Sequence, residues 1–422
     1  MLGIQSSIGH RMSSIPYRTS SIEPAKMEDT RSLDSAANTG VQLPERRNEL
    51  FATAYPVLCP SMVWPRRKHP ELPFPFNHPS ARYFYFARNA LYALARHWNL
   101  AGKEVLFPSY FHGVELEALL AAGVHVRFYP VRQGMRVNLD EVVSLIRDRT
   151  RVIYLIHYLG FPGPVRELSE LCRHRNLLLI EDCALALLSR HEERLLGSWG
   201  DAAIYCLYKS LPVPNGGALV LRRGGLSAFR QHAPPPWRNS FSSAARSLDS
   251  YLSNHRKNWQ RKLLKMMRNA AKKTGRSVDA NSAQAGTNHF NPLHAEVGMS
   301  RLSHWVLASQ NFSAIVEKRR KNFSYMLERL RGLAPPVFEG LPQGVCPLSY
   351  PLLVKDKPAV VEKFLARGVE AVNMWFPNHP AGPKDPFPET YELRRTVLEL
   401  PCHQDLALAD LDRVIAAARE IL

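Results

Sequence analysis

Short apolar segments alternate with segments of helical periodicity from about residue 80 onward. The first helical segment is 87–98, in which Leu91, Leu94 and Ala95 fall on one face. Further helices are predicted at 114–122, 139–147 and 165–175, and strands at 104–107, 126–129, 151–156 and 177–180. Because these strands are apolar along their whole length and are separated by helices, the pattern predicts a mostly parallel sheet covered on both faces. We therefore expect an α/β fold.

The apolar segments are of strand length, and none reaches the roughly eighteen residues that a membrane-spanning helix requires. The 422 residues, 45% hydrophobic and 22% charged, allow a large buried core and favour two packed regions. The six cysteines form no CxxC pair, and several lie inside apolar runs. We interpret them as reduced thiols of a cytoplasmic protein, and we expect no bound metal ion.

Four regions are predicted along the chain. Residues 1–50 are rich in Ser and Arg without apolar periodicity, so we interpret them as a disordered extension, with a transit peptide as the alternative. Residues 51–224 carry the α/β pattern, and residues 225–288 are an insertion. Residues 289–422 are expected to form a smaller α+β domain with a strand at 349–354 and helices at 295–307, 312–330, 359–367 and 408–421.

The net charge of +18 is concentrated in the insertion. From Arg222 to Arg276 there are fourteen Lys or Arg residues and one acid, Asp249. Apolar residues in this segment follow one helical stripe while basic residues occupy the remainder, which predicts a basic amphipathic helix. The helix can pack on the protein, lie on an anionic membrane surface or meet a lipid-linked substrate through residues 245–276, or bind another polyanion or partner. Nucleic acid is the least supported partner, because no nucleic-acid-binding fold signature is present.

Chemistry in a parallel sheet is expected beyond the carboxyl ends of its strands, where helix N-termini point inward. Polar and aromatic side chains follow three predicted strands, at 108–112, 157–160 and 181–184. A fourth segment holds Lys209 between apolar residues and a turn rich in Pro and Gly. A partly desolvated lysine loses its proton more readily and can attack a carbonyl carbon, so Lys209 is the candidate nucleophile. The alternative is a lysine packed for structural reasons.

Six segments stand out in order along the chain: 86–91 (FARNAL), 105–110 (VLFPSY), 156–160 (IHYLG), 180–184 (IEDCA), 200–217 (GDAAIYCLYKSLPVPNGG) and 399–403 (ELPCH). In this order they resemble the DegT-type nucleotide-sugar aminotransferases. The resemblance runs from about residue 81 to the C-terminus, with a gap at the basic insertion. It implies the fold type I of enzymes that depend on pyridoxal 5'-phosphate (PLP), in which a seven-stranded, mostly parallel sheet is flanked by helices and joined to a smaller domain.

The resemblance also implies roles for individual residues. Lys209 would hold PLP as a Schiff base, and Asp182 would pair with the pyridine nitrogen and keep it protonated, although Asp182 could instead be a helix N-cap. Where the family has a Gly-Thr phosphate cup, this chain has Arg88 and Asn89; Arg88 could supply charged donors or face solvent. Cys206 matches the position of a hydroxyl in the family and is a poor donor.

Four further residues have implied positions around the cofactor. His112 or Tyr110, with His112 preferred, would cover the outer face of the ring. His157 matches the HxYG element of the family and would position the wall beside the cofactor rather than transfer protons. Asn291 would reach the cofactor of the neighbouring subunit. Trp375 and His403 would line the acceptor pocket, with buried packing as the alternative.

The implied activity is a PLP-dependent transfer of an amino group from an amino acid, glutamate in the first instance, to a keto sugar attached to a nucleotide. A homodimer is implied as well. Two departures suggest a divergent subfamily: the interval from Asp201 to Lys209 is about two residues shorter than usual, and Leu185 stands where a polar residue is common. The retained lysine argues against the dehydratase branch. The alternatives are other PLP chemistry on the same scaffold, such as elimination or natural-product amination, and a non-catalytic membrane-surface protein that keeps the fold.

Overall fold

The computed structural model describes residues 50–62, 71–223, 232–235, 289–376, 378–383 and 387–422, with a few positions between 245 and 266. They belong to one compact unit, Asn48–Leu422. The predicted N-terminal extension and most of the basic insertion lie outside the described residues.

The larger sheet has seven strands in the order β1-β9-β8-β5-β4-β2-β3. The pairs among β3, β2, β4, β5 and β8 are parallel, whereas β9 runs antiparallel to β8 and to β1. This architecture confirms the predicted mostly parallel sheet. The strands are β1 (Arg82–Phe84), β2 (Glu104–Pro108), β3 (His125–Tyr129), β4 (Thr150–Ile156), β5 (Leu178–Asp182), β8 (Ala202–Cys206) and β9 (Gly217–Leu221).

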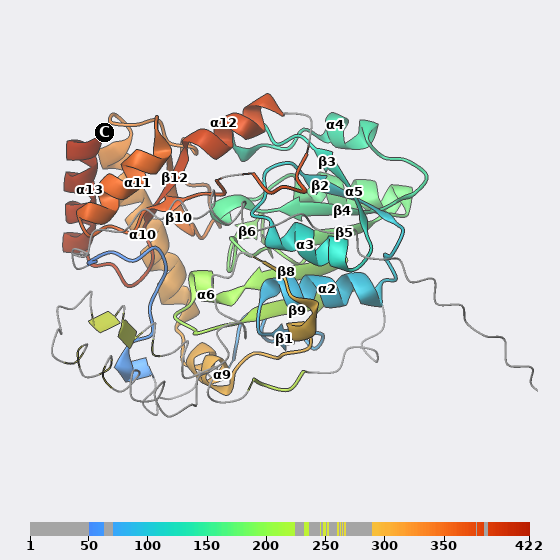
Figure 1. Cartoon of the computed structure of the whole chain (residues 1–422), viewed down its shortest axis with the longest axis horizontal. Coiled ribbons are helices and arrows are strands. Elements are labelled where there is room, and N and C mark those ends of the chain that lie inside the picture. The colour runs from blue at the N-terminus through green and yellow to red at the C-terminus, as the bar shows by residue number, and fades with distance from the viewer. Residues whose placement is uncertain are drawn as a thin grey trace, which may run out of the picture. The chain divides into compact units, whose positions relative to one another are not determined.

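Helices flank this sheet near the predicted positions. In Figure 1, α2 and α3 lie in front of the sheet. Asn138 caps α4 through its side chain, and α5 ends at Asn176 in the left-handed conformation. The helices are α2 (Ala87–His97), α3 (Val114–Ala121), α4 (Leu139–Ser144), α5 (Val165–Arg175) and the single turn α6 (Leu207–Ser210), with 3-10 turns η1 (Pro60–Met62), η2 (Gln133–Met135) and η3 (Tyr158–Gly160) and a hairpin of β6 (Arg190–His191) and β7 (Arg194–Leu195).

The C-terminal part has its own sheet and core. Its strands β10 (Ser349–Leu353), β12 (Val397–Pro401) and β11 (Val372–Asn373) are antiparallel. A second hydrophobic cluster lies between these strands and their helices, which Figure 1 shows beside β10 and β12. The helices are α10 (Phe312–Leu330), α11 (Lys357–Ala366), α12 (Pro388–Thr396) and α13 (Leu408–Ile421).

The structure differs from the sequence prediction between residues 289 and 308. The predicted helix 295–307 is wrong in its first half, where the chain forms the 3-10 turn η5 (Pro292–His294) and then runs extended beside β1, with Tyr85 N donating to Val297 O at 2.8 Å. The helix α9 (Arg301–Ala308) begins only after Ser300, whose side chain accepts from Ser303 N. Its buried Val306 and Leu307 belong to the core of the larger sheet. The domain boundaries at 224 and 288 stay a prediction.

Within the basic insertion, the positions described from Ala245 to Met266 are helical. Ala245 and Leu252 are buried, whereas the side chain of Met266 is 68% exposed. No helix within the described ranges is long and apolar enough to cross a membrane. Whether the basic helix packs on the protein or binds a membrane surface stays a prediction.

Candidate active site

A pocket opens beyond the carboxyl ends of β2, β4, β5 and β8. Five of the residues implied at the cofactor line it: Arg88, His112, Asp182, Cys206 and Lys209. These five come from segments up to 121 residues apart in sequence, since Arg88 lies in the first turn of α2 and Lys209 lies in the turn after β8. Trp375, which was considered for the acceptor pocket, lines the same pocket. The other lining residues are Phe86, Ala87, Leu91, Val114, Glu115, Tyr154, Ile156, Ala184, Leu185, Ile204 and Tyr208.

Asp182 ends β5 with both carboxylate oxygens held. Its Oδ2 accepts a hydrogen bond from the Tyr154 hydroxyl at 2.6 Å, and its Oδ1 accepts from Ala184 N at 2.8 Å. Burial, together with the nearby charge of Glu115, raises the pKa of Asp182 to about 6, and the hydrogen bond from Tyr154 opposes the shift. A carboxylate that is oriented but desolvated in this way is stabilised by a cationic partner, such as a protonated ring nitrogen.

Lys209 is placed by a sharp reversal of the chain. Strand β8 ends at Cys206, α6 makes one turn, and the chain returns through Gly216 and Gly217 into β9. Leu207 N donates to Gly216 O at 2.9 Å, which closes the base of this reversal. The Lys209 amine therefore enters the pocket from a short turn that is anchored at one end by β8 and at the other by β9.

The N-terminus of α2 forms another wall. Arg88 is 9% exposed, and its Cζ lies 4.0 Å from the centroid of the Phe86 ring. Burial lowers the pKa of Arg88. Gly217 lets β9 approach this helix start, because a Cβ at that position would lie 2.4 Å from Ala87 N. A buried guanidinium at a helix N-terminus is suited to binding a phosphate dianion.

His112 lies at the mouth of the pocket, on the loop between β2 and α3. Glu115 fixes this loop by accepting from His112 N at 2.7 Å and from Gly113 N at 3.0 Å. Although the His112 side chain is accessible to solvent, the surrounding protein and the charges of Lys209 and Arg88 lower its pKa. The imidazole is therefore neutral near pH 7 and can pack on a flat ring.

Four residues selected from the sequence are not among those lining the pocket. Tyr110 is fully buried and packs on Trp375, with ring centroids 4.7 Å apart. His157 is turned toward Glu181, its Nε2 lying 3.2 Å from Oε2, and its Nδ1 accepts from Gly163 N.

The other two lie at helix starts. Asn89 is buried in α2, and Asn291 is exposed, with its side chain accepting from Leu293 N. Roles for these four residues at a cofactor stay predictions. His403, considered for the acceptor pocket, is buried, and its Nε2 forms a hydrogen bond with Thr53 O at 2.9 Å.

Sequence reasoning missed three polar residues of the pocket. Tyr154 carries the one polar side-chain group in the run 152–156, which is a usable signal for a functional hydroxyl. Glu115 is at the start of α3, where an acid also satisfies the helix N-terminus. Tyr208 adjoins Lys209 and carries no such signal, because buried aromatic residues are common.

Comparisons with known proteins give a family match over most of the chain. The DegT/DnrJ/EryC1/StrS aminotransferase family matches residues 88–419. The chain is 32% identical over 105 residues to the dTDP-4-dehydro-2,3,6-trideoxy-D-glucose 4-aminotransferase of Saccharopolyspora spinosa, covering 25% of this chain and 27% of the relative. It is 26% identical over 122 residues to the GDP-perosamine synthase of Escherichia coli O157:H7, covering 28% and 34%. The matched segments thus span about a quarter to a third of these curated relatives.

Solved structures extend the likeness over most of the chain. The aminotransferase TlmJ from Streptoalloteichus hindustanus has a TM-score of 0.59 at 21% identity, covering 81% of this chain and 85% of that chain. PseC from Helicobacter pylori, an aminotransferase involved in the biosynthesis of pseudoaminic acid, has a TM-score of 0.57 at 17% identity, covering 81% and 86%. At these identities the likeness is one of fold.

Proposed function

Because this chain belongs to the DegT/DnrJ/EryC1/StrS aminotransferase family, we propose that it transfers an amino group from an amino acid to a nucleotide-linked keto sugar, with glutamate as the donor. The enzymes of this family depend on PLP. The observation that carries the proposal is the shared pocket of Lys209 and Asp182. The sugar acceptor is supported by the relatives, one named as a 4-aminotransferase of a dTDP-linked dehydro sugar and the other as a GDP-perosamine synthase.

The residues of the pocket fit PLP. A buried carboxyl group with both oxygens oriented by donors suits the ring nitrogen, and the Arg88 guanidinium at the start of α2 suits the phosphate. When bound, PLP supplies an electron sink that makes the loss of a proton from the α-carbon of a substrate possible. Lys209 would attach the cofactor covalently, and Asp182 would pair with the ring nitrogen. Arg88 would bind the phosphate, and His112 would pack on the face of the ring.

The protein side chains then have distinct tasks. Lys209, once released from covalent attachment, would carry the proton from the substrate α-carbon. Tyr154 would hold the Asp182 carboxylate in the orientation needed to keep a proton on the ring nitrogen. Cys206 is buried and its pKa is raised by that burial, so it would contribute a neutral thiol beside Lys209. Leu185 would leave one side of the site apolar.

Assembly and location belong to the same proposal. We infer a cytoplasmic homodimer in which Asn291, exposed in the single chain, faces the partner subunit. The basic insertion would bring the enzyme to an anionic membrane surface or to a lipid-linked substrate. The crowding of positive charge between Arg222 and Arg276 supports this part of the proposal.

A half-reaction tests the function directly. Purified protein reconstituted with PLP is mixed with L-glutamate; we expect the absorbance of the bound cofactor to change with release of 2-oxoglutarate in equal amount. Borohydride reduction followed by peptide mapping should place the cofactor on Lys209. Absorbance that changes without 2-oxoglutarate would favour other PLP chemistry. Failure to bind PLP at all would favour a non-catalytic protein.

The start of α2, where we propose that the phosphate binds, provides a further test. We expect Gly217→Ala to destabilise the protein by about 1–3 kcal/mol, because the new Cβ must displace the start of α2. PLP should also raise the melting temperature of this variant less than that of the parent. Thermal unfolding with and without PLP measures both effects. Gly332→Ala is the matched control, since nothing lies within 4 Å of a Cβ there. An unchanged response to PLP would show that this close approach does not shape the phosphate site.

A further inference from the structure

Arg394 is a buried arginine whose hydrogen-bond partners, within the described residues, are main-chain carbonyl oxygens. It lies on α12, is 4% exposed, and donates to Ser109 O at 3.1 Å, Phe111 O at 3.2 Å and Trp375 O at 2.8 Å. Its guanidinium also lies 5.4 Å from the centroid of the Tyr110 ring. One side chain therefore joins the loop after β2 to the turn after β11.

Lys357 completes this contact from α11. The residue is fully buried, and its Nζ donates to Met374 O at 2.9 Å and to the carbonyl oxygen of Arg394. Burial lowers the pKa of Lys357 to about 7, while the nearby Glu399 opposes that shift and Arg394 reinforces it. Since both forms of the amine donate hydrogen bonds, the contact with Met374 persists on either side of that pH.

Arg394 and Lys357 together hold a strained residue. Trp375 has φ +53, in the left-handed region that residues other than glycine rarely adopt. Such a conformation persists only where the surroundings hold it, and here the carbonyls of Met374 and of Trp375 accept hydrogen bonds from Lys357 and Arg394 respectively. Trp375 lines the same pocket as Lys209 and Asp182.

The loop on the other side of Arg394 also leads into the pocket. His112 directly follows Phe111 and, like Trp375, lines the pocket. Helix α12 is further fastened to this edge of the sheet, because Thr390 and Ser109 exchange a hydrogen bond of 2.6 Å and Glu389 binds Arg132. The C-terminal part of the chain thus places two walls of the pocket through one helix.

We propose that Arg394 and Lys357 are positioning residues that hold Trp375 and the His112 loop as walls of the pocket and thereby determine how tightly PLP and the amino acceptor fit. The proposal rests on the proposed function for the identity of the ligands. The placement of Trp375 itself can be measured without either ligand, so the positioning role and the proposed function can fail separately.

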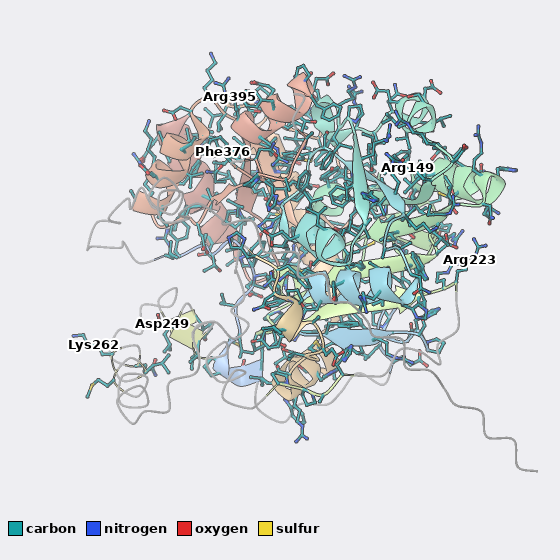
Figure 2. All side chains as sticks on the ribbon, turned by 45° about the vertical axis from the view of Figure 1, so that its right-hand side comes forward. Arg149, Arg223, Asp249, Lys262, Phe376 and Arg395 are labelled. Carbon is teal, nitrogen blue, oxygen red and sulfur yellow. The ribbon has the colours of Figure 1, made fainter. Side chains whose placement is uncertain are left out.

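The experiment compares Arg394→Met with Arg395→Met in the full chain. Arg395 is the next residue on α12 and is exposed, and Figure 2 shows it at the surface, which makes it a matched control. Acrylamide quenching of fluorescence is measured in the absence of PLP, with and without Trp375→Phe, so that the difference reports Trp375. PLP affinity is then measured by absorbance titration. Arg394→Lys serves as a second variant, since it keeps the charge but loses the fork that spans both segments.

We expect Arg394→Met to raise the quenching of Trp375 at least threefold and to weaken PLP binding by about tenfold, with Arg395→Met unchanged and Arg394→Lys between them. A folded Arg394→Met variant whose Trp375 is quenched as in the parent overturns the proposal. Loss of folding in both Arg394 variants assigns the residue to general stability and overturns it as well. If the parent fails to bind PLP, the proposed function fails, and the quenching result still decides the positioning role.

Discussion

Replacing Lys209 by alanine should lower the rate of the glutamate half-reaction by about 10³-fold or more, because one side chain both attaches the cofactor and carries the proton from the α-carbon. Lys209→Arg should be equally inactive, since it keeps a positive charge but not a nucleophilic amine. Single-turnover absorbance with L-glutamate measures the rate. Borohydride labelling measures the attachment.

The control for this prediction is Lys363→Ala, an exposed lysine on α11. Lys357 is the residue that could compete for attachment of the cofactor, because it is the one fully buried lysine in the described part of the chain. If Lys209→Ala still retained PLP on a borohydride-labelled peptide, and that peptide contained Lys357, the assignment of the attachment residue would be wrong.

The second large effect is expected for Asp182→Asn. An amide of the same shape cannot keep the ring nitrogen protonated, so we expect PLP to bind while the half-reaction slows by about 10²–10³-fold, the loss typical of removing one preorganised electrostatic partner. Steady-state and single-turnover rates with L-glutamate measure this loss of rate. Asp148→Asn, at an exposed position, is the control. A variant with parental rates would exclude Asp182 as the partner of the ring.

Asp182 also predicts a pH dependence. Its pKa in the folded protein is raised to about 6 from 3.8, so the folded state binds more protons than the unfolded state between those values. The stability that this group contributes is therefore full below about pH 4 and is lost as the pH rises through about 6. PLP binding, which the ionised carboxylate favours, should strengthen over the same rise. In Asp182→Asn both dependences should disappear, as thermal unfolding and PLP titration across this range would show.

Much of the larger sheet was predictable because its signals are local. Apolar runs mark β2, β4 and β5 since each strand is buried on both faces, and helical periodicity marks α2 and α5 since each buries one face. Lys209 was recognisable as a candidate because it follows such a strand at its carboxyl end, whereas the role of Asp182 was implied by the family resemblance. The missed helix α12 has few apolar residues, and the wrong start of helix 295–307 came from a segment whose backbone pairs with β1 instead of with itself.

The amino-acid sequence alone determined the α/β pattern and the concentration of positive charge in the insertion, because neighbouring residues along one strand or helix carry that information. It also predicts Lys209 and Asp182 as the amine and the acid of the site, through the position of the lysine after an apolar strand and through the family resemblance. Only the tertiary structure decided that His112 rather than Tyr110 lines the pocket, that His157 faces Glu181, and that Arg394 contacts residues more than 280 positions away. Those outcomes depend on which carbonyls and rings packing brings together, and a residue's own neighbours in the chain do not record them.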